Sequence, residues 1–281
     1  MTSVLYDVPG PKAKVRARVI SWITGLVVVA VVVYVGLTLW QKGMWDPTRW
    51  DIFNDPLVWA VLLRGLVVVL QSALVATVLA LLLGMVFSLL RMSSHRVIRI
   101  PTTVVLEFFR GMPVLLMMLF ILLAFPGVSP FWAVVSALAV YNGAIIGEAL
   151  RSGVVALPKG QREAGLAIGL RPLQARLLIE FPQAFRNMLP IIVAQIVVLL
   201  KDTALGYIVG QVALIREGEL LAEFVGRQQY FFSIFLVMLA MYLAINLTIS
   251  TIARQLAKRR GVKVSKVVVP MPDGSMSTTL T

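Results

Sequence analysis

The stretch REAGLAIGLRPLQARLLIEFP, residues 162–182, has the pattern of a short helical hairpin, although hydrophobic segments long enough to cross a bilayer flank it on both sides. Pro158 can begin the first helix, because the N–H that proline lacks is not needed in a first turn. Gly169 can adopt the left-handed conformation that closes this helix. Pro172 then begins a second helix, PLQARLLIEF, which Pro182 is predicted to end. These signals predict a small polar unit on one side of a membrane.

The first helix of this hairpin has two unlike faces. Small or apolar residues lie on one face and charged residues on the other: Ala164, Ala167 and Ile168 against Lys159, Arg162 and Glu163. Such a helix is typical of one that docks against another protein. The alternative interpretation is an amphipathic loop that lies on the lipid headgroups.

The composition outside the hairpin is that of an integral membrane protein. Of the 281 residues, 59% are hydrophobic and only 14% are charged, and the mean hydropathy is +0.90. The chain has no cysteine and one histidine, which excludes a disulfide framework, a thiolate nucleophile and a His-rich or Cys-based metal site. The net charge of +13 is better explained by membrane topology and anionic headgroups than by nucleic acid, because of where the charges lie.

On either side of the hairpin the sequence predicts membrane-spanning helices, six in all, because about 20 apolar residues are needed to cross the hydrocarbon core. The third and fourth are separated by FPGVSP, which contains two helix-breaking prolines and a glycine. The predicted spans are residues 21–40, 66–90, 104–125, 131–150, 191–215 and 228–253.

Basic residues predict the orientation of these spans. Most of the 26 Lys and Arg residues fall in four clusters, before residue 20, at 91–99, at 151–186 and after residue 253. If all four are cytoplasmic, the spans of this cell-membrane protein alternate correctly and both termini lie in the cytoplasm. The predicted organisation is a basic tail and retained anchor at 1–56, a core at 57–255 and a basic, disordered tail at 256–281.

Lys201 and Asp202 lie within the predicted fifth span, where a charge normally faces a cavity or a partner. Neighbouring helical residues point about 100° apart, so the two are poorly placed to pair with each other. Gln195 shares a helix face with Asp202. We interpret this polar seam as part of a translocation path for a charged zwitterion. A structural ion pair or a break in the helix is the alternative.

Polar residues on the third and fourth spans are further candidates. Asn142 lies mid-membrane, and Glu148 and Arg151 are one turn apart near the cytoplasmic end. These three are predicted to line the path, and for Asn142 a structural role is an equal alternative. Glu107 and Arg110 form an i,i+3 pair that has the simpler explanation of mutual neutralisation.

Several motifs resemble those of permease subunits of ABC importers. The cytoplasmic signature of that family runs Glu-Ala-Ala, three residues, Gly, nine residues, Ile-x-Leu-Pro, and the chain matches it at Glu163, Ala164, Gly169, Ile179 and Pro182. Gly165 and Phe181 depart from it. RGMP, PKGQ, PQAFRNMLP and KDTAL are similar to motifs of the polar amino acid branch. YNGAIIGEALRSG and QREAGLAIGL are most similar to actinobacterial glutamate importer permeases.

The resemblance implies an all-α, polytopic type I permease fold with a cytoplasmic coupling helix. It assigns coupling to Glu163, Ala164, Gly165, Gly169 and Arg171, and makes Arg110 and Pro113 candidates for gating. The implied partners are a dimer of ABC ATPase subunits, a second permease subunit of a different sequence, an extracytoplasmic solute-binding protein and the lipid membrane. ATP and Mg²⁺ would be bound by the ATPase, because this chain lacks a GxxxxGK[ST] loop and is expected to bind no cofactor.

The sequence leaves two alternatives to a transporter subunit. An intramembrane enzyme would use Asp202 or Glu148 as an acid or base, but no nucleophile or metal set accompanies them. An ion channel would need a self-contained pore and no ATPase.

Overall fold

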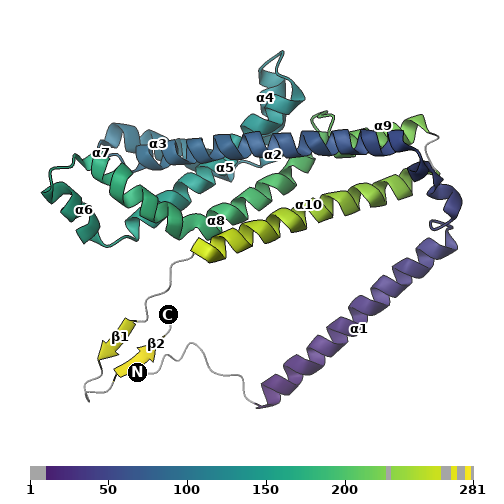
Figure 1. Cartoon of the computed structure of the whole chain (residues 1–281), viewed down its shortest axis with the longest axis horizontal. Helices are drawn as coiled ribbons and strands as arrows, with labels where there is room; N and C mark the ends of the chain where they lie inside the picture. The colour runs from purple at the N-terminus through teal and green to yellow at the C-terminus, as the bar shows by residue number, and fades with distance from the viewer. Residues whose placement is uncertain (1–10, 226–228, 261–266, 271–275, 280–281) are drawn as a thin grey trace.

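The computed structural model describes residues 11–225, 229–260, 267–270 and 276–279, and nearly all of them are helical (Figure 1). The helices are α1 Pro11–Gln41, α2 Pro56–Arg91, α3 Arg96–Gly111, α4 Val114–Ala124, α5 Pro130–Val155, α6 Lys159–Ala167, α7 Pro172–Ala175, α8 Phe181–Asp202, α9 Leu214–Phe224 and α10 Phe231–Arg260. Short 3₁₀ helices lie at Pro47–Arg49, Asp51–Asn54 and Thr203–Tyr207, and a π-helix lies at Arg176–Glu180. The all-α prediction is confirmed.

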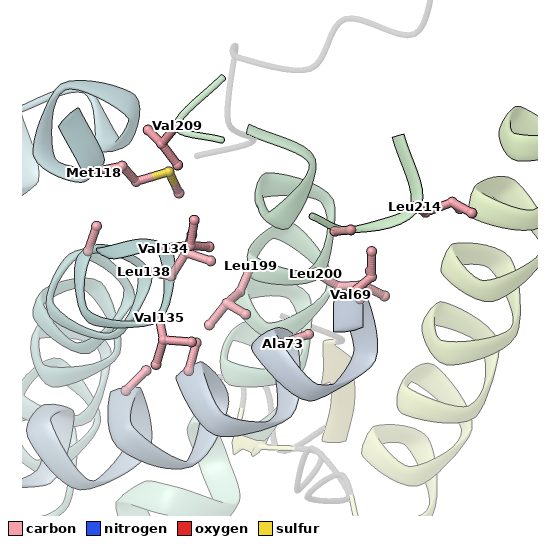
Figure 2. Packing of buried hydrophobic residues seen from close by; sticks show 14 of the residues in the cluster. Val69, Ala73, Met118, Val134, Val135, Leu138, Leu199, Leu200, Val209 and Leu214 are labelled. Carbon is pink, nitrogen blue, oxygen red and sulfur yellow. The ribbon is translucent and has the colours of Figure 1, made fainter. Parts of the chain in front are cut away.

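The core lies where α2, α5 and α8 pack together. Figure 2 shows side chains of all three helices directed toward one another: Val69 and Ala73 of α2, Val134, Val135 and Leu138 of α5, and Leu199 and Leu200 of α8. Small residues bring α2 and α5 unusually close. A Cβ placed on Gly84 would lie 2.8 Å from Cγ2 of Ile146, and one on Gly147 would lie 3.0 Å from the carbonyl oxygen of Gly84. Close helix approach through small residues is typical of membrane bundles.

Five helical segments are long and apolar enough to cross a membrane: Val15–Gln41, Pro56–Arg91, Pro130–Val155, Pro172–Tyr207 and Phe231–Ile252. They confirm four of the predicted spans, although α2 begins ten residues before the predicted residue 66, and they correct the bounds of the fifth, which begins and ends earlier than predicted. The span predicted at 104–125 is not a single helix. In its place α3 and α4 meet at a 105° bend.

The bend between α3 and α4 has a local cause. Met112 has φ −88° and ψ 130°, an extended conformation that a residue before proline prefers. Pro113, which follows it, cannot donate a backbone hydrogen bond that would continue the helix. The two helices together count as a sixth, broken span.

The prediction that Pro182 ends a helix is also wrong. From Pro172 to Asp202 the chain is helical without interruption, through α7, the π-helix and α8. The π-turn directly before Pro182 loosens the backbone where its ring would otherwise crowd the preceding turn. The side-chain amide of Gln183 donates to the carbonyl of Ile179 (2.9 Å), which gives that oxygen a partner.

The same helix ends earlier than predicted. α8 stops at Asp202, and a 3₁₀ turn follows, so residues 191–215 are not one continuous helix. The end of α8 is held by Tyr242 of α10, whose hydroxyl lies 2.8 Å from Oγ1 of Thr203 and donates to the carbonyl of Leu200 (3.1 Å). Lys201 and Asp202 therefore occupy the last helical turn rather than the middle of a span.

The predicted N-terminal anchor is a helix that does not pack against the bundle. No part of the span in α1 is buried, and Figure 1 shows it running away from the other helices. Aromatic rings connect its C-terminal end to α10: Trp45 stacks on Trp50 at 6.0 Å and meets the edge of Phe232 at 6.0 Å. The side-chain amide of Gln229 also donates to the carbonyl of Thr48 (2.9 Å).

The C-terminal segment predicted to be disordered contains regular structure where the structure describes it. α10 continues to Arg260, and β1 (Val267–Pro270) pairs with β2 (Met276–Thr279) in antiparallel register, Val267 opposite Thr279. Three consecutive valines and two threonines favour extended backbone. The remaining residues of this tail, and residues 1–10 of the N-terminal tail, lie outside the described residues.

Candidate functional site

The hairpin forms as a compact turn of α6 against the start of the long helix. Gly169 has φ +88°, the left-handed conformation predicted for it. Gly165 is buried against this helix, and a Cβ there would lie 2.7 Å from Cδ1 of Ile179 and 3.3 Å from Cβ of Ala175. The N–H of Arg171 donates to Oε1 of Gln174 (2.9 Å). Gly165, which departs from the family signature, thus allows the two helices to pack closely.

The outer surface of the hairpin is exposed and mixes charge with apolar side chains. Glu163, Ala164 and Arg171 are exposed, and Ile168 at the tip is 78% exposed. Leu173 is 56% exposed on the adjoining turn. An apolar tip beside charged residues has the chemistry of a surface that binds another protein.

Two candidates for the path, Asn142 and Gln195, meet inside the bundle. The Gln195 amide donates to Oδ1 of Asn142 (2.8 Å), which joins α8 to α5. The Asn142 amide in turn donates to the carbonyl of Leu138 (2.8 Å), and Asn142 is fully buried. This pair is a satisfied polar contact between a buried and a partly buried side chain of the bundle.

The other candidates on α5 belong to a chain of ion pairs at one end of the bundle. Glu148 binds Arg151 at 2.7 Å and also binds Arg91 of α2. Arg91 continues to Glu107 of α3 at 2.9 Å, and Glu107 binds Arg110 at 3.1 Å. The gating candidate Arg110 is thereby connected to Glu148 and Arg151 through three helices.

Arg91 is the functional candidate that sequence reasoning missed. It follows a long run of uncharged residues in α2, so it was interpreted only as a topology signal. Its side chain is 16% exposed and is the only bridge between Glu107 and Glu148 among the described residues. A partly buried guanidinium that contacts two carboxylates is well suited to fix three helix ends, because its planar fork binds both at once.

Lys201 and Asp202 stand apart from these groups. Lys201 is exposed and Asp202 is partly buried, and within the described parts of the chain neither forms an ion pair or side-chain hydrogen bond. The structure does not bring them into hydrogen-bond contact with Asn142 or Gln195. Both remain available to an external partner at the end of α8.

The described residues contain no group of three His, Asp or Glu side chains arranged to hold a metal. Glu148, the carboxylate considered for acid–base chemistry, is bound by two arginines, and the Ser152 hydroxyl lies 3.5 Å from its Oε1, at the outer limit of a hydrogen bond. The geometry thus favours binding and movement over covalent chemistry.

Residues 76–262 match the protein family described as the binding-protein-dependent transport system inner membrane component, over more than half of the chain. The chain belongs to this family. It is therefore a multi-pass membrane protein and a subunit of a transporter, with no catalytic activity of its own. The type I permease fold implied by the hairpin motif is confirmed.

The chain is similar to permease proteins of amino acid transporters. The glutamate transport system permease protein GluD of Corynebacterium glutamicum is 37% identical over 249 residues, covering 84% of this chain and 90% of that protein. The probable glutamine ABC transporter permease protein GlnP of Bacillus subtilis is 34% identical over 205 residues, covering 72% and 94%. The chain is an amino acid ABC importer permease.

Solved structures of amino acid ABC transporters have a similar fold. A crystal structure of an amino acid ABC transporter with histidines superimposes with a TM-score of 0.62 at 27% identity, covering 71% of this chain and 94% of that chain. The inward-facing MetNI methionine ABC transporter gives a TM-score of 0.54 at 15% identity, covering 77% and 99%. The second likeness concerns the fold alone.

Proposed function

We propose that the chain is the membrane-spanning subunit through which an ATP-driven importer moves glutamate by alternating access. Its similarity to GluD over most of both chains supports the substrate. ATP and Mg²⁺ would be bound by two ATPase subunits. A second permease subunit of a different sequence and an extracytoplasmic solute-binding protein would complete the complex, with both termini of this chain in the cytoplasm.

The observation that carries the mechanism is the uninterrupted helical run from Pro172 to Asp202. Its first two turns pack against α6, the exposed part of the hairpin, and its last turn holds Lys201 and Asp202. A packed helix moves largely as a rigid body. An ATPase that binds the hairpin and closes on ATP would therefore displace the far end of α8 by the same rotation.

The residues on α8 match the charges of an acidic amino acid. Asp202 would bind the α-ammonium group of the substrate and Lys201 a carboxylate, since both lack an internal partner among the described residues. Asn142 and Gln195 would exchange their mutual hydrogen bond for contacts to the substrate when the bundle opens. Glu148, Arg151 and Arg110 would hold the cytoplasmic end closed.

The decisive experiment is ATP hydrolysis by the complete complex in proteoliposomes, measured with a panel of amino acids and the binding protein. We expect stimulation by glutamate and much weaker stimulation by glutamine, arginine and methionine. Stimulation by a different amino acid alone would disprove the substrate. Amino acid flux in vesicles that contain no ATPase would favour a channel.

Coupling is tested by Gly169→Val. Valine strongly disfavours the φ of +88°, so the tip of the hairpin should distort and substrate-stimulated ATP hydrolysis should fall at least tenfold, with normal membrane insertion. Gly160→Val is the matched control, because Gly160 lies in α6 of the same hairpin, has no positive φ and has open space around it. Equal activity of both variants would show that the hairpin does not couple the ATPase to transport.

A further inference from the structure

A basic cleft of about 590 Å³ lies between α6 and the ends of α2, α3 and α5. Six cationic side chains line it: Arg91, Arg99, Arg151, Lys159, Arg162 and Arg176. Only two carboxylates, Glu163 and Glu180, line it as well. The excess of positive charge makes the cleft a site for an anion.

Half of these cations have no anionic partner among the described residues. Arg91 and Arg151 bind Glu148, and Arg176 lies 3.9 Å from Glu180. Arg99, Lys159 and Arg162 form no ion pair with any described residue. The three come from two elements, α3 and α6, that both line the cleft, so an anion in it could be bound by both.

A neighbouring depression of about 320 Å³ indicates the kind of anion. It shares Arg91, Arg99 and Arg151 with the cleft and adds Ile100 and Val104 of α3. These two apolar side chains are 56% and 63% exposed. They extend the cationic site along a strongly amphipathic helix that enters the membrane, so the site combines a place for a phosphate with a place for an acyl chain.

We propose that this cleft binds the phosphate group of an anionic phospholipid from the cytoplasmic leaflet, with the acyl chain lying along Ile100 and Val104. Basic pockets between transmembrane helices on the cytoplasmic side are known to bind such headgroups. A free phosphate would satisfy the three unpaired cations but not the apolar side chains. The lipid would bind α3 and the coupling hairpin together and would thereby stabilise the hairpin against the bundle.

The test is native mass spectrometry of the purified permease in detergent, titrated with phosphatidylglycerol, phosphatidylcholine or inorganic phosphate. Arg99→Gln/Lys159→Gln removes two unpaired cations, and at about 1 kcal/mol per basic residue its affinity for phosphatidylglycerol should fall roughly ten- to thirty-fold. Arg96→Gln/Arg171→Gln is the control, because it removes the same charge from α3 and the hairpin outside the cleft.

Preferential binding of phosphatidylglycerol, lost in the first double variant and retained in the control, would support the proposal. Equal binding of phosphatidylcholine, equal loss in both variants, or inorganic phosphate that displaces the lipid at equimolar concentration would overturn it. Unchanged lipid binding together with loss of ATPase co-purification would also overturn it, because the cleft would then be a protein contact. The readout needs neither the ATPase nor the substrate, so its outcome is independent of the proposed transport function.

Discussion

At the scale of single residues, Gly165 explains how the hairpin departs from the family signature without losing its packing. A Cβ at this position meets first the Cδ1 atom of Ile179, the far end of a flexible side chain. An alanine is therefore tolerated once Ile179 rotates. A larger side chain also meets the Cβ atom of Ala175, which cannot move without its backbone.

We expect Gly165→Ala to keep wild-type amounts of ATPase bound to the permease, and Gly165→Leu to lose most of it, because leucine would separate α6 from the long helix. The measurement is the ratio of ATPase to permease after affinity purification. Gly160→Leu, in open space on the same helix, provides the control. If Gly165→Leu binds the ATPase normally, close packing of the hairpin is not required for docking.

Arg91 shows what sequence spacing cannot predict. Its contact with Glu148 joins residues 57 positions apart, whereas the pairs Glu148–Arg151 and Glu107–Arg110 follow from i,i+3 spacing. A local rule finds the two short pairs but not the arginine that connects them. The partner of Arg91 depends on how closely α2 and α5 approach, which is a property of the whole bundle.

Arg91→Met should lower the apparent melting temperature of the permease by about 4–8 °C, since hydrogen bonds to charged groups contribute roughly 1.5–3 kcal/mol. Arg96→Met, on an exposed side chain, should change it little. A double-mutant cycle with Glu107→Gln separates the ion pair from general loss of charge. If the changes in melting temperature caused by Arg91→Met and Glu107→Gln are additive, the ion pair between these two residues does not stabilise the protein.

At the scale of elements, hydropathy located the helices but not their breaks. Spans depend on composition over about 20 residues, which any sequence window reports. Breaks depend on the backbone at one or two residues. Pro113 breaks a helix, whereas Pro182 lies inside one because a π-turn precedes it. Residue type alone does not distinguish these two prolines.

The bend at Pro113 can be measured with spin labels, because the chain has no native cysteine. Labels at Val104→Cys and Leu123→Cys should lie roughly 17 Å apart along helix axes bent by 105°, against about 28 Å in a straight helix rising 1.5 Å per residue. Pro113→Ala should shift the distance toward the longer value and reduce uptake. Pro101→Ala, at a proline inside α3, should leave it unchanged. An unaltered distance in Pro113→Ala would assign the bend to tertiary packing instead.

At the scale of the whole molecule, the ion pairs decide how often the chain crosses the membrane. Arg91 ends α2, and Glu148 and Arg151 lie near the end of α5, so their contacts place these two helix ends on the same side. Only α3, α4 and α5 lie between them. Because α5 crosses once, the bent pair of α3 and α4 must also cross once and is not a re-entrant loop. Six crossings follow, as the sequence predicted.

The count of six crossings can be tested directly with single cysteines and a membrane-impermeant maleimide on intact cells. Gly127→Cys, between α4 and α5, and Glu217→Cys, in α9, should react from outside. Ser94→Cys and Gly160→Cys should react only after the cells are permeabilised, since their loops carry the basic clusters. A re-entrant α3–α4 pair would instead place Gly127 and Ser94 on one side and Gly160 on the other. External labelling at Gly160→Cys would thus contradict both the count of six crossings and a cytoplasmic hairpin. External labelling at Gly127→Cys, without external labelling at Ser94→Cys or Gly160→Cys, would show that α5 crosses back to the cytoplasm and so places the hairpin on the side of the ATPase.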